Sequence, residues 1–103
     1  IMSIKKQFLK TKPVCKVSFK LSNEQANGAS KVNIAGDFNN WNETSDEMNT
    51  LKDGSFTLTL DLETGREYQF RYLLDGTNWI NDEAADSYCP SGFGDSQNSV
   101  ITL

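Results

Sequence analysis

Two tryptophans and an arginine stand out as residues whose types and surroundings suit the binding of a ligand. Trp41 lies among asparagines directly after an expected strand end, and Trp79 follows polar residues beyond an Asp-Gly turn. Arg71 alternates with aromatic residues, so it faces away from the core if they are buried. An indole ring packs on the apolar C–H face of a pyranose, while amide and guanidinium groups hydrogen bond with its hydroxyls. These residues favour a shallow carbohydrate-binding surface with micromolar to millimolar affinity.

Trp41 on its own leaves two interpretations open. The β-branched run at residues 31–35 predicts a strand that ends at Gly36, and small polar residues then carry the chain into a turn. An indole at this place either lies exposed as a flat surface on which a ligand stacks, or folds back as a lid on the edge of the fold.

The residues of a catalytic centre are scarce in this chain. It has no histidine, which is the commonest general base and the commonest partner of a nucleophile. Two carboxylates suffice for glycoside hydrolysis, but the acidic candidates lie at expected turns, where such residues have structural reasons to be. These candidates are Asp37, Asp75, Asp82, Glu83, Asp86 and Asp95. We predict a non-catalytic protein, with an accessory part of a glycoside hydrolase or branching-enzyme system as the alternative.

Neither a metal nor a cofactor is expected. Asp82, Glu83 and Asp86 could together hold calcium, but their spacing matches no EF-hand loop, so a solvated acidic loop is predicted. The chain has no glycine-rich phosphate loop, and Cys15 and Cys89 form neither a metal motif nor a disulfide framework.

Cysteine usage and the N-terminal sequence favour the cytoplasm. Two unpaired cysteines suit a reducing compartment. The lysine-rich start lacks the apolar core and cleavage site of a signal peptide, and Met2 is the expected natural start. No apolar run approaches the roughly 20 residues of a membrane helix, so no membrane partner is expected.

Charge is unevenly distributed along the chain. Six of the ten basic residues, all lysines, precede the first acidic residue, Glu24, although the formal net charge is −4. We predict a basic N-terminal arm at residues 1–13, solvated or lying against its own acidic domain, and a single domain at residues 14–103. The arm has no arginine and one aromatic residue, Phe8, so no nucleic-acid partner is expected.

Short segments with period-two alternation make up most of the domain. Apolar and polar residues alternate at 15–21, 56–62 and 68–74, and shorter strands are predicted at 31–35, 50–51, 79–80 and 99–103. Asn-Gly and Asp-Gly pairs provide turns between them, and no segment has the apolar period of a helix. The pattern predicts an all-β, antiparallel β-sandwich of immunoglobulin-like size with six to eight short strands.

The order of motifs resembles the glycogen-binding modules. GDFNNW at residues 36–41 is followed by Asp-Gly at 53–54, by YQFRYLLDG at 68–76 with Trp79 beyond it, and by NSV at 98–100. This family, carbohydrate-binding module family 48, includes the carbohydrate-binding domain of the AMP-activated protein kinase β subunit. It also includes the N-terminal early-set domains of isoamylases and glycogen-branching enzymes. The resemblance covers residues 14–103 and implies an early-set, immunoglobulin-like fold.

The resemblance also implies a set of site residues. In the kinase modules the tryptophans at the positions of Trp41 and Trp79 stack on α-glucose rings. A lysine at the place of Arg71 and an asparagine at the place of Asn98 bond sugar hydroxyls. The expected function is a module that binds an α-glucan, glycogen or starch, through these four residues, with a glycogen-metabolising enzyme as an expected partner.

One segment departs from the kinase pattern. The kinase modules carry a leucine shortly before the asparagine, whereas this chain has Phe93 at a different spacing, so the role of that leucine is not assigned to it. Residues 84–94 are more similar to the isoamylase-type domains, in which sugar binding is often absent. The alternative function is therefore an early-set interaction domain that uses its aromatic surface to dock a partner enzyme or to self-associate.

Overall fold

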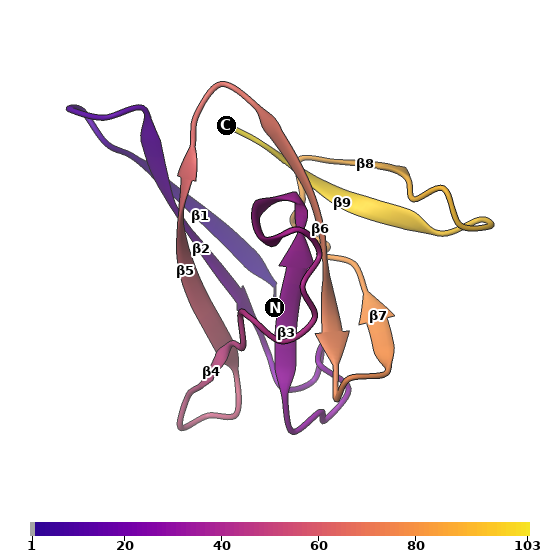
Figure 1. Cartoon of the computed structure of the whole chain (residues 1–103). Coiled ribbons are helices and arrows are strands. Elements are labelled where there is room, and N and C mark those ends of the chain that lie inside the picture. The colour runs from indigo at the N-terminus through magenta and orange to yellow at the C-terminus, as the bar shows by residue number, and fades with distance from the viewer. Residues whose placement is uncertain (1) are drawn as a thin grey trace.

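Nine β-strands form two antiparallel sheets in the computed structural model, which describes residues 2–103 (Figure 1). The first sheet has the strand order β1-β2-β5-β4, and the second has the order β3-β6-β9-β8 with β7 paired to β6. The strands are β1 (Ser3–Phe8), β2 (Val14–Leu21), β3 (Val32–Gly36), β4 (Asn49–Thr50), β5 (Phe56–Glu63), β6 (Glu67–Leu74), β7 (Asn78–Ile80), β8 (Ser87–Pro90) and β9 (Gln97–Thr102). The two sheets pack as the layers of a sandwich, so the predicted all-β, antiparallel fold is confirmed.

Aromatic side chains join the two sheets in the core. Phe19 of β2 meets Phe70 of β6 edge to face, with ring centroids 5.2 Å apart, and Tyr72 packs against Phe70 at 5.8 Å. All three side chains are fully buried. Because side chains alternate along a strand, Gln69 and Arg71 of β6 point to the opposite, outer face of the second sheet.

The N-terminal segment, expected as an arm outside the sandwich, contributes a strand to it. β1 pairs with β2 along its whole length, from Ser3 opposite Lys20 to Phe8 opposite Cys15. Residue 1 of the expected arm lies outside the described residues. Lysines are common on edge strands, where they discourage pairing with other chains, and here they obscure the alternation of the strand. The sandwich therefore begins at Ser3 and not at residue 14.

β8 is the second strand that the sequence does not predict. With β1 it brings the strands of the described chain to nine, above the expected six to eight. β8 pairs with β9 at the edge of the second sheet, and its side chains are mostly exposed, so it lacks the apolar alternation of a core strand. Figure 1 shows that the β8–β9 and β1–β2 hairpins extend toward opposite sides of the molecule.

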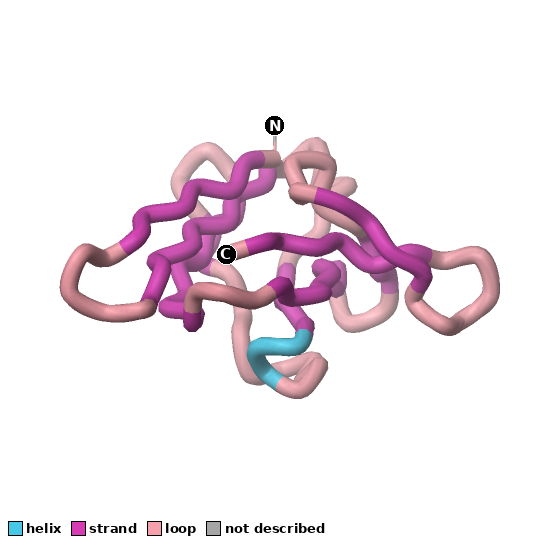
Figure 2. The backbone as a smooth tube through the Cα atoms, turned by 90° about the horizontal axis from the view of Figure 1, so that it is seen from above, coloured by secondary structure: helices cyan, strands magenta, loops and turns pink. Residues whose placement is uncertain are grey.

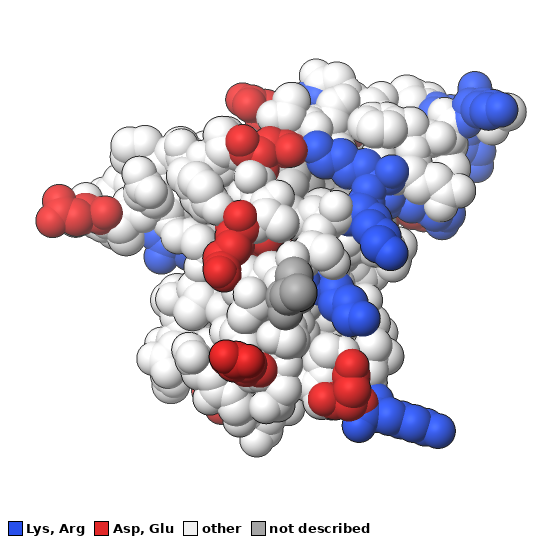
Figure 3. All heavy atoms as spheres, turned by 180° about the vertical axis from the view of Figure 1, so that it is seen from behind, with Lys and Arg blue, Asp and Glu red and all other residues white. Residues whose placement is uncertain are grey.

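Basic and acidic side chains occupy different sides of the molecule. In Figure 3 the basic ones gather over the side formed by the β1–β2 hairpin, and the acidic ones lie mainly on the other side. Lys6 of β1 nevertheless pairs with Asp86, with 2.6 Å between Nζ and Oδ2, and Lys16 of β2 pairs with Asp61 of β5 at 3.1 Å. Part of the basic segment thus lies against acidic residues of its own domain.

One short helical element occurs among residues 2–103, a 3₁₀ turn at Asp37–Asn39 (η1), drawn in cyan in Figure 2. The sequence predicts no helix, because a single turn is too short to show an apolar period. Nothing helical in the described residues has the length and apolar character needed to span a membrane.

Asp82 departs from the prediction of a solvated acidic loop, because it is fully buried. Its Oδ2 accepts a hydrogen bond from the Tyr72 hydroxyl at 2.5 Å, and its Oδ1 accepts one from the Ala84 N–H at 2.7 Å. Tyr88 of β8 donates its hydroxyl to the Asp82 carbonyl at 2.6 Å. The buried hydroxyl of Tyr72 needs a partner, and Asp82 supplies it from a loop that shows no apolar pattern in the sequence.

The burial of Asp82 makes stability depend on pH. Loss of hydration raises the pKa of the Asp82 carboxyl above its ordinary value of 3.8, so the folded chain holds this proton more tightly than the unfolded chain does. Its contribution to the free energy of unfolding is therefore present below about pH 4 and is lost as the pH rises through the raised pKa.

Asp82→Asn should remove this dependence, because its amide has no proton to lose, can accept from Ala84 and can donate to the Tyr72 hydroxyl. We expect the free energy of unfolding of Asp82→Asn, minus that of the natural chain, to increase as the pH rises above about 4. Urea unfolding between about pH 3 and 8 measures this difference. A difference that stays constant with pH would contradict the assignment.

Candidate functional site

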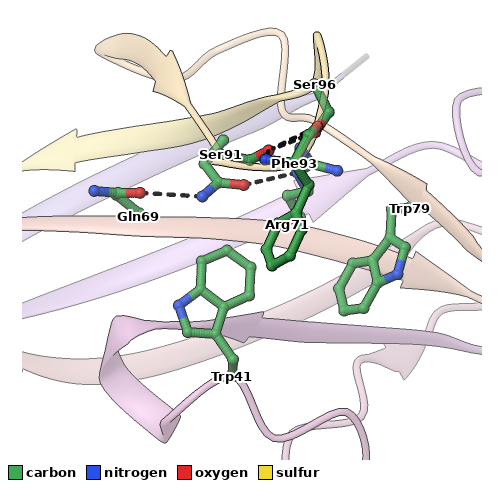
Figure 4. A pocket seen from close by; sticks show the side chains of 8 residues that line it. Trp41, Gln69, Arg71, Trp79, Ser91, Phe93 and Ser96 are labelled. Carbon is green, nitrogen blue, oxygen red and sulfur yellow. Dashed lines mark hydrogen bonds between the residues drawn. The ribbon is translucent and has the colours of Figure 1, made fainter.

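Four residues that the sequence assigns to a binding site converge on one hollow of the surface. Trp41, Arg71, Trp79 and Asn98 line a groove of about 520 Å³ (Figure 4). The groove, which we name the aromatic groove, is lined further by Gln69, Ser91, Phe93 and Ser96. Strands β6, β7 and β9, the turn after β3 and the hairpin between β8 and β9 bring these residues together.

The two indole rings of the groove lie side by side. Their centroids are 6.5 Å apart, and their planes are inclined by 59°. Trp79 is 38% exposed, Trp41 is half-buried, and neither belongs to the hydrophobic core. Trp41 therefore forms part of an accessible surface, tilted with respect to Trp79 and not coplanar with it.

The backbone of Trp41 has an unusual conformation. Its φ is +57°, directly after Asn40 at +55°, which is a region that bulky residues rarely adopt. The Trp41 N–H donates to the Gly36 carbonyl at 2.8 Å, and the side chain of Asn39 accepts from the Gly36 N–H and donates to the Ile34 carbonyl, both at 3.0 Å. Backbone strain of this kind persists only where surrounding contacts enforce it, and it is typical of binding sites.

Asp37 connects this turn to the central strand of the groove. Its Oδ1 accepts the indole Nε1–H of Trp41 at 3.1 Å, and its Oδ2 accepts the backbone N–H of Gln69 in β6 at 2.8 Å. Gly36 allows this close approach, because a Cβ there would lie 2.4 Å from the Gln69 carbonyl oxygen. One carboxylate thus fixes the orientation of Trp41 relative to β6.

A chain of hydrogen bonds orders the polar floor of the groove (Figure 4). The Arg71 Nε–H donates to Asn98 Oδ1 at 2.8 Å, and Asn98 Nδ2–H donates to Gln69 Oε1 at 3.0 Å. Asn98 is only 7% exposed, and the Nη2 of Arg71 is buried without a partner in the part of the chain that the structure describes. The floor is therefore preorganised, and Arg71 keeps donor capacity that these bonds do not use.

Four residues of the groove are absent from the set that the sequence assigns to the site. Gln69 could have been found from the alternation of β6, because it shares the outer face with Arg71. Ser91, Phe93 and Ser96 belong to the β8–β9 hairpin, which was not expected because β8 carries no strand signal. Phe93 is 82% exposed, the most exposed large apolar side chain in the described residues.

Comparison with known proteins shows which family the chain matches. A family model described as the glycogen recognition site of AMP-activated protein kinase matches residues 19–100 of the chain. This range includes every residue that lines the aromatic groove. A search of curated proteins found no match.

Removal of the Asp37 carboxylate should release Trp41. In Asp37→Ala the indole loses its hydrogen-bond acceptor and the Gln69 N–H loses its partner, so we expect a shifted and broadened indole N–H resonance for Trp41 and a loss of about 1–3 kcal/mol in the free energy of unfolding. Nuclear magnetic resonance and urea unfolding measure the two effects. Asp61→Ala, which removes the exposed pair with Lys16 on the other sheet, is the control and should leave the resonance in place. An unaltered resonance in Asp37→Ala would contradict this role.

Proposed function

The chain belongs to the family of the glycogen recognition site of AMP-activated protein kinase, and on this premise we propose that it is a non-catalytic module that binds α-glucans, glycogen or starch, in the aromatic groove. The observation that carries the proposal is the convergence of Trp41, Arg71, Trp79 and Asn98 on one open surface. Each of them is the residue type that sugar recognition uses: flat rings for the apolar face of glucose and donors for its hydroxyls.

The tryptophan pair supplies most of the binding energy in this proposal. A half-covered indole removes about 75–125 Å² from water, which corresponds to about 2–3 kcal/mol at ~25 cal/mol per Å². Two such contacts, reduced by the cost of association, give a dissociation constant in the micromolar to millimolar range. A polymer such as glycogen compensates for weak single contacts by presenting many equivalent chains.

The angle between the rings supports a curved ligand. Planes inclined by 59° cannot both lie flat against a straight, ribbon-like polysaccharide. The glucose units of an α-1,4-linked chain turn progressively as the chain coils, so neighbouring units present their faces at an angle to one another. The aromatic groove is therefore better suited to an α-glucan than to a flat β-linked glucan.

Phe93 is proposed as a third ring of the site. The hairpin that carries it is held by its own hydrogen bonds: Ser91 N–H to the Ser96 carbonyl at 3.0 Å, Phe93 N–H to Ser91 Oγ at 3.1 Å, and Ser96 Oγ–H to the Phe93 carbonyl at 2.7 Å. Figure 4 shows the hairpin residues facing the tryptophan pair across the groove. An apolar side chain held at 82% exposure gains stability only when something covers it, and a sugar face is the ligand that this groove suits.

The proposal extends to the setting in which the module acts. Both cysteines, Cys15 and Cys89, are free thiols, which suits a reducing cytoplasm where glycogen is stored. A module without catalytic groups of its own would bring a glycogen-metabolising enzyme to its substrate. Docking of a partner protein on the same aromatic surface is the competing function, and the experiment below distinguishes the two.

Affinity electrophoresis through gels that contain glycogen tests the proposed function. We expect the natural chain to be retarded, and Trp41→Ala and Trp79→Ala each to weaken binding by about 30-fold or more, because each loses about 2 kcal/mol of stacking. Phe8→Ala, which removes an exposed ring of β1 outside the groove, is the matched control and should bind as the natural chain does. Unretarded migration of the natural chain would overturn glucan binding and leave partner docking as the function.

Phe93→Ala tests the third ring. Because the side chain is 82% exposed, its loss should leave the free energy of unfolding within about 0.5 kcal/mol. Affinity for maltodextrins should nevertheless fall about tenfold, since a partly covered phenyl ring contributes about 1.4 kcal/mol or more. Isothermal titration calorimetry measures the change, and equal affinity in the two proteins would remove Phe93 from the site.

A further inference from the structure

A second hollow lies next to the aromatic groove on the outer face of the same sheet. It has a volume of about 380 Å³ and is bounded by β3, by the turn between β6 and β7, and by the loop that follows Trp41. Asn33, Leu73, Glu43 and Thr44 are among its lining residues. None of them lines the aromatic groove.

The two hollows share the central strand β6. Gln69 and Arg71 of β6 line the aromatic groove, and Leu73, the next outward residue, lines the second hollow. Two residues along a strand span about 7 Å, so the floors of the two hollows adjoin. Leu73 is also the register partner of Trp79 in β7 and of Asn33 in β3. A row of outward side chains therefore leads from the tryptophan pair into the second hollow.

Each hollow contains a buried donor without a partner. The described residues have two buried side-chain nitrogens that no group of the chain satisfies, Arg71 Nη2 and Asn33 Nδ2. Arg71 lines the aromatic groove and Asn33, which is 3% exposed, lines the second hollow. Buried donors are nearly always paired in folded proteins. Two unpaired donors on one face of the sheet, one in each hollow, therefore point to a ligand acceptor at both places.

The rim of the second hollow suits a neutral, hydroxyl-rich ligand. Its charges are mixed: Lys31, which also lies 4.0 Å from Glu47, lines it together with the exposed carboxylates of Glu43 and Asp75. Thr44 adds a hydroxyl that donates to Asn42 at 3.1 Å and keeps its lone pairs to accept. An anion would be repelled by Glu43 and Asp75, whereas sugar hydroxyls can donate to these carboxylates and accept from Lys31.

We propose that the second hollow is a further sugar subsite, which takes glucose units of the α-glucan beyond those that cover Trp41 and Trp79. The inference rests on the proposed function, because it continues the same ligand along β6. In a bound glucan, a hydroxyl oxygen of the added unit accepts the Asn33 Nδ2–H, and another donates to Glu43 or Thr44. Affinity then rises with chain length past the point at which the aromatic groove is filled.

Calorimetric titration of the whole chain with maltopentaose and with maltodecaose tests the subsite. For the natural chain we expect maltodecaose to bind about fivefold more tightly than maltopentaose, after correction for the number of binding registers, because it gains hydrogen bonds in the second hollow. In Asn33→Val this ratio should fall to about one, while the affinity for maltopentaose stays unchanged. Valine suits a strand and removes an unsatisfied buried donor, so the unfolding midpoint should be the same or higher.

Thr44→Val serves as a second variant on the exposed rim, where the fold is not at risk, and should lower the ratio as well. Thr59→Val, on the outer face of the other sheet, is the control and should preserve it. A ratio that survives both Asn33→Val and Thr44→Val, or a ratio near one in the natural chain, overturns the subsite while glucan binding stands. Absence of binding of either sugar to the natural chain overturns the proposed function itself.

Discussion

The packing of β6, a central strand of the second sheet, against the first sheet is the constraint on which the rest of the structure depends. Phe70 and Tyr72 fill the core on one side of this strand, and Phe70 meets Phe19 of the opposite sheet. Their burial fixes the strand so firmly that the residues alternating with them have defined positions on the other side. Gln69 and Arg71 are thereby held at fixed spacing on the outer face, so the core sets the geometry of the groove.

The turn after β3 converts this rigid strand into a site. Gly36 lets the backbone of the turn approach β6 closely, and Asp37 then bonds both the strand and the ring of Trp41. Trp41 accepts a left-handed backbone that no property of tryptophan favours. The strained backbone that places this one ring lowers the stability of the fold, in keeping with a role in recognition.

Sequence patterns were sufficient for the parts of the molecule that repeat a simple rule. The alternation in 15–21, 56–62 and 68–74 predicted three strands and the sandwich, and the tryptophans among polar residues, together with the family resemblance, located the groove. β1 and β8 were missed because edge strands carry little apolar alternation, and the hairpin with Phe93 was missed with β8. Asp82 was misjudged because its burial is decided by Tyr72, a partner ten positions away whose hydroxyl no local pattern reveals.

Phe93 has a consequence for the free protein in concentrated solution. A phenyl ring that is 82% exposed on this hairpin favours self-association, since two molecules can bury their rings against each other. Under the proposed function, ligand and self-contact would compete for the same surface, and the unliganded chain would be the form that clusters. A glucan bound as proposed would cover Phe93 and so would also reduce aggregation of the protein.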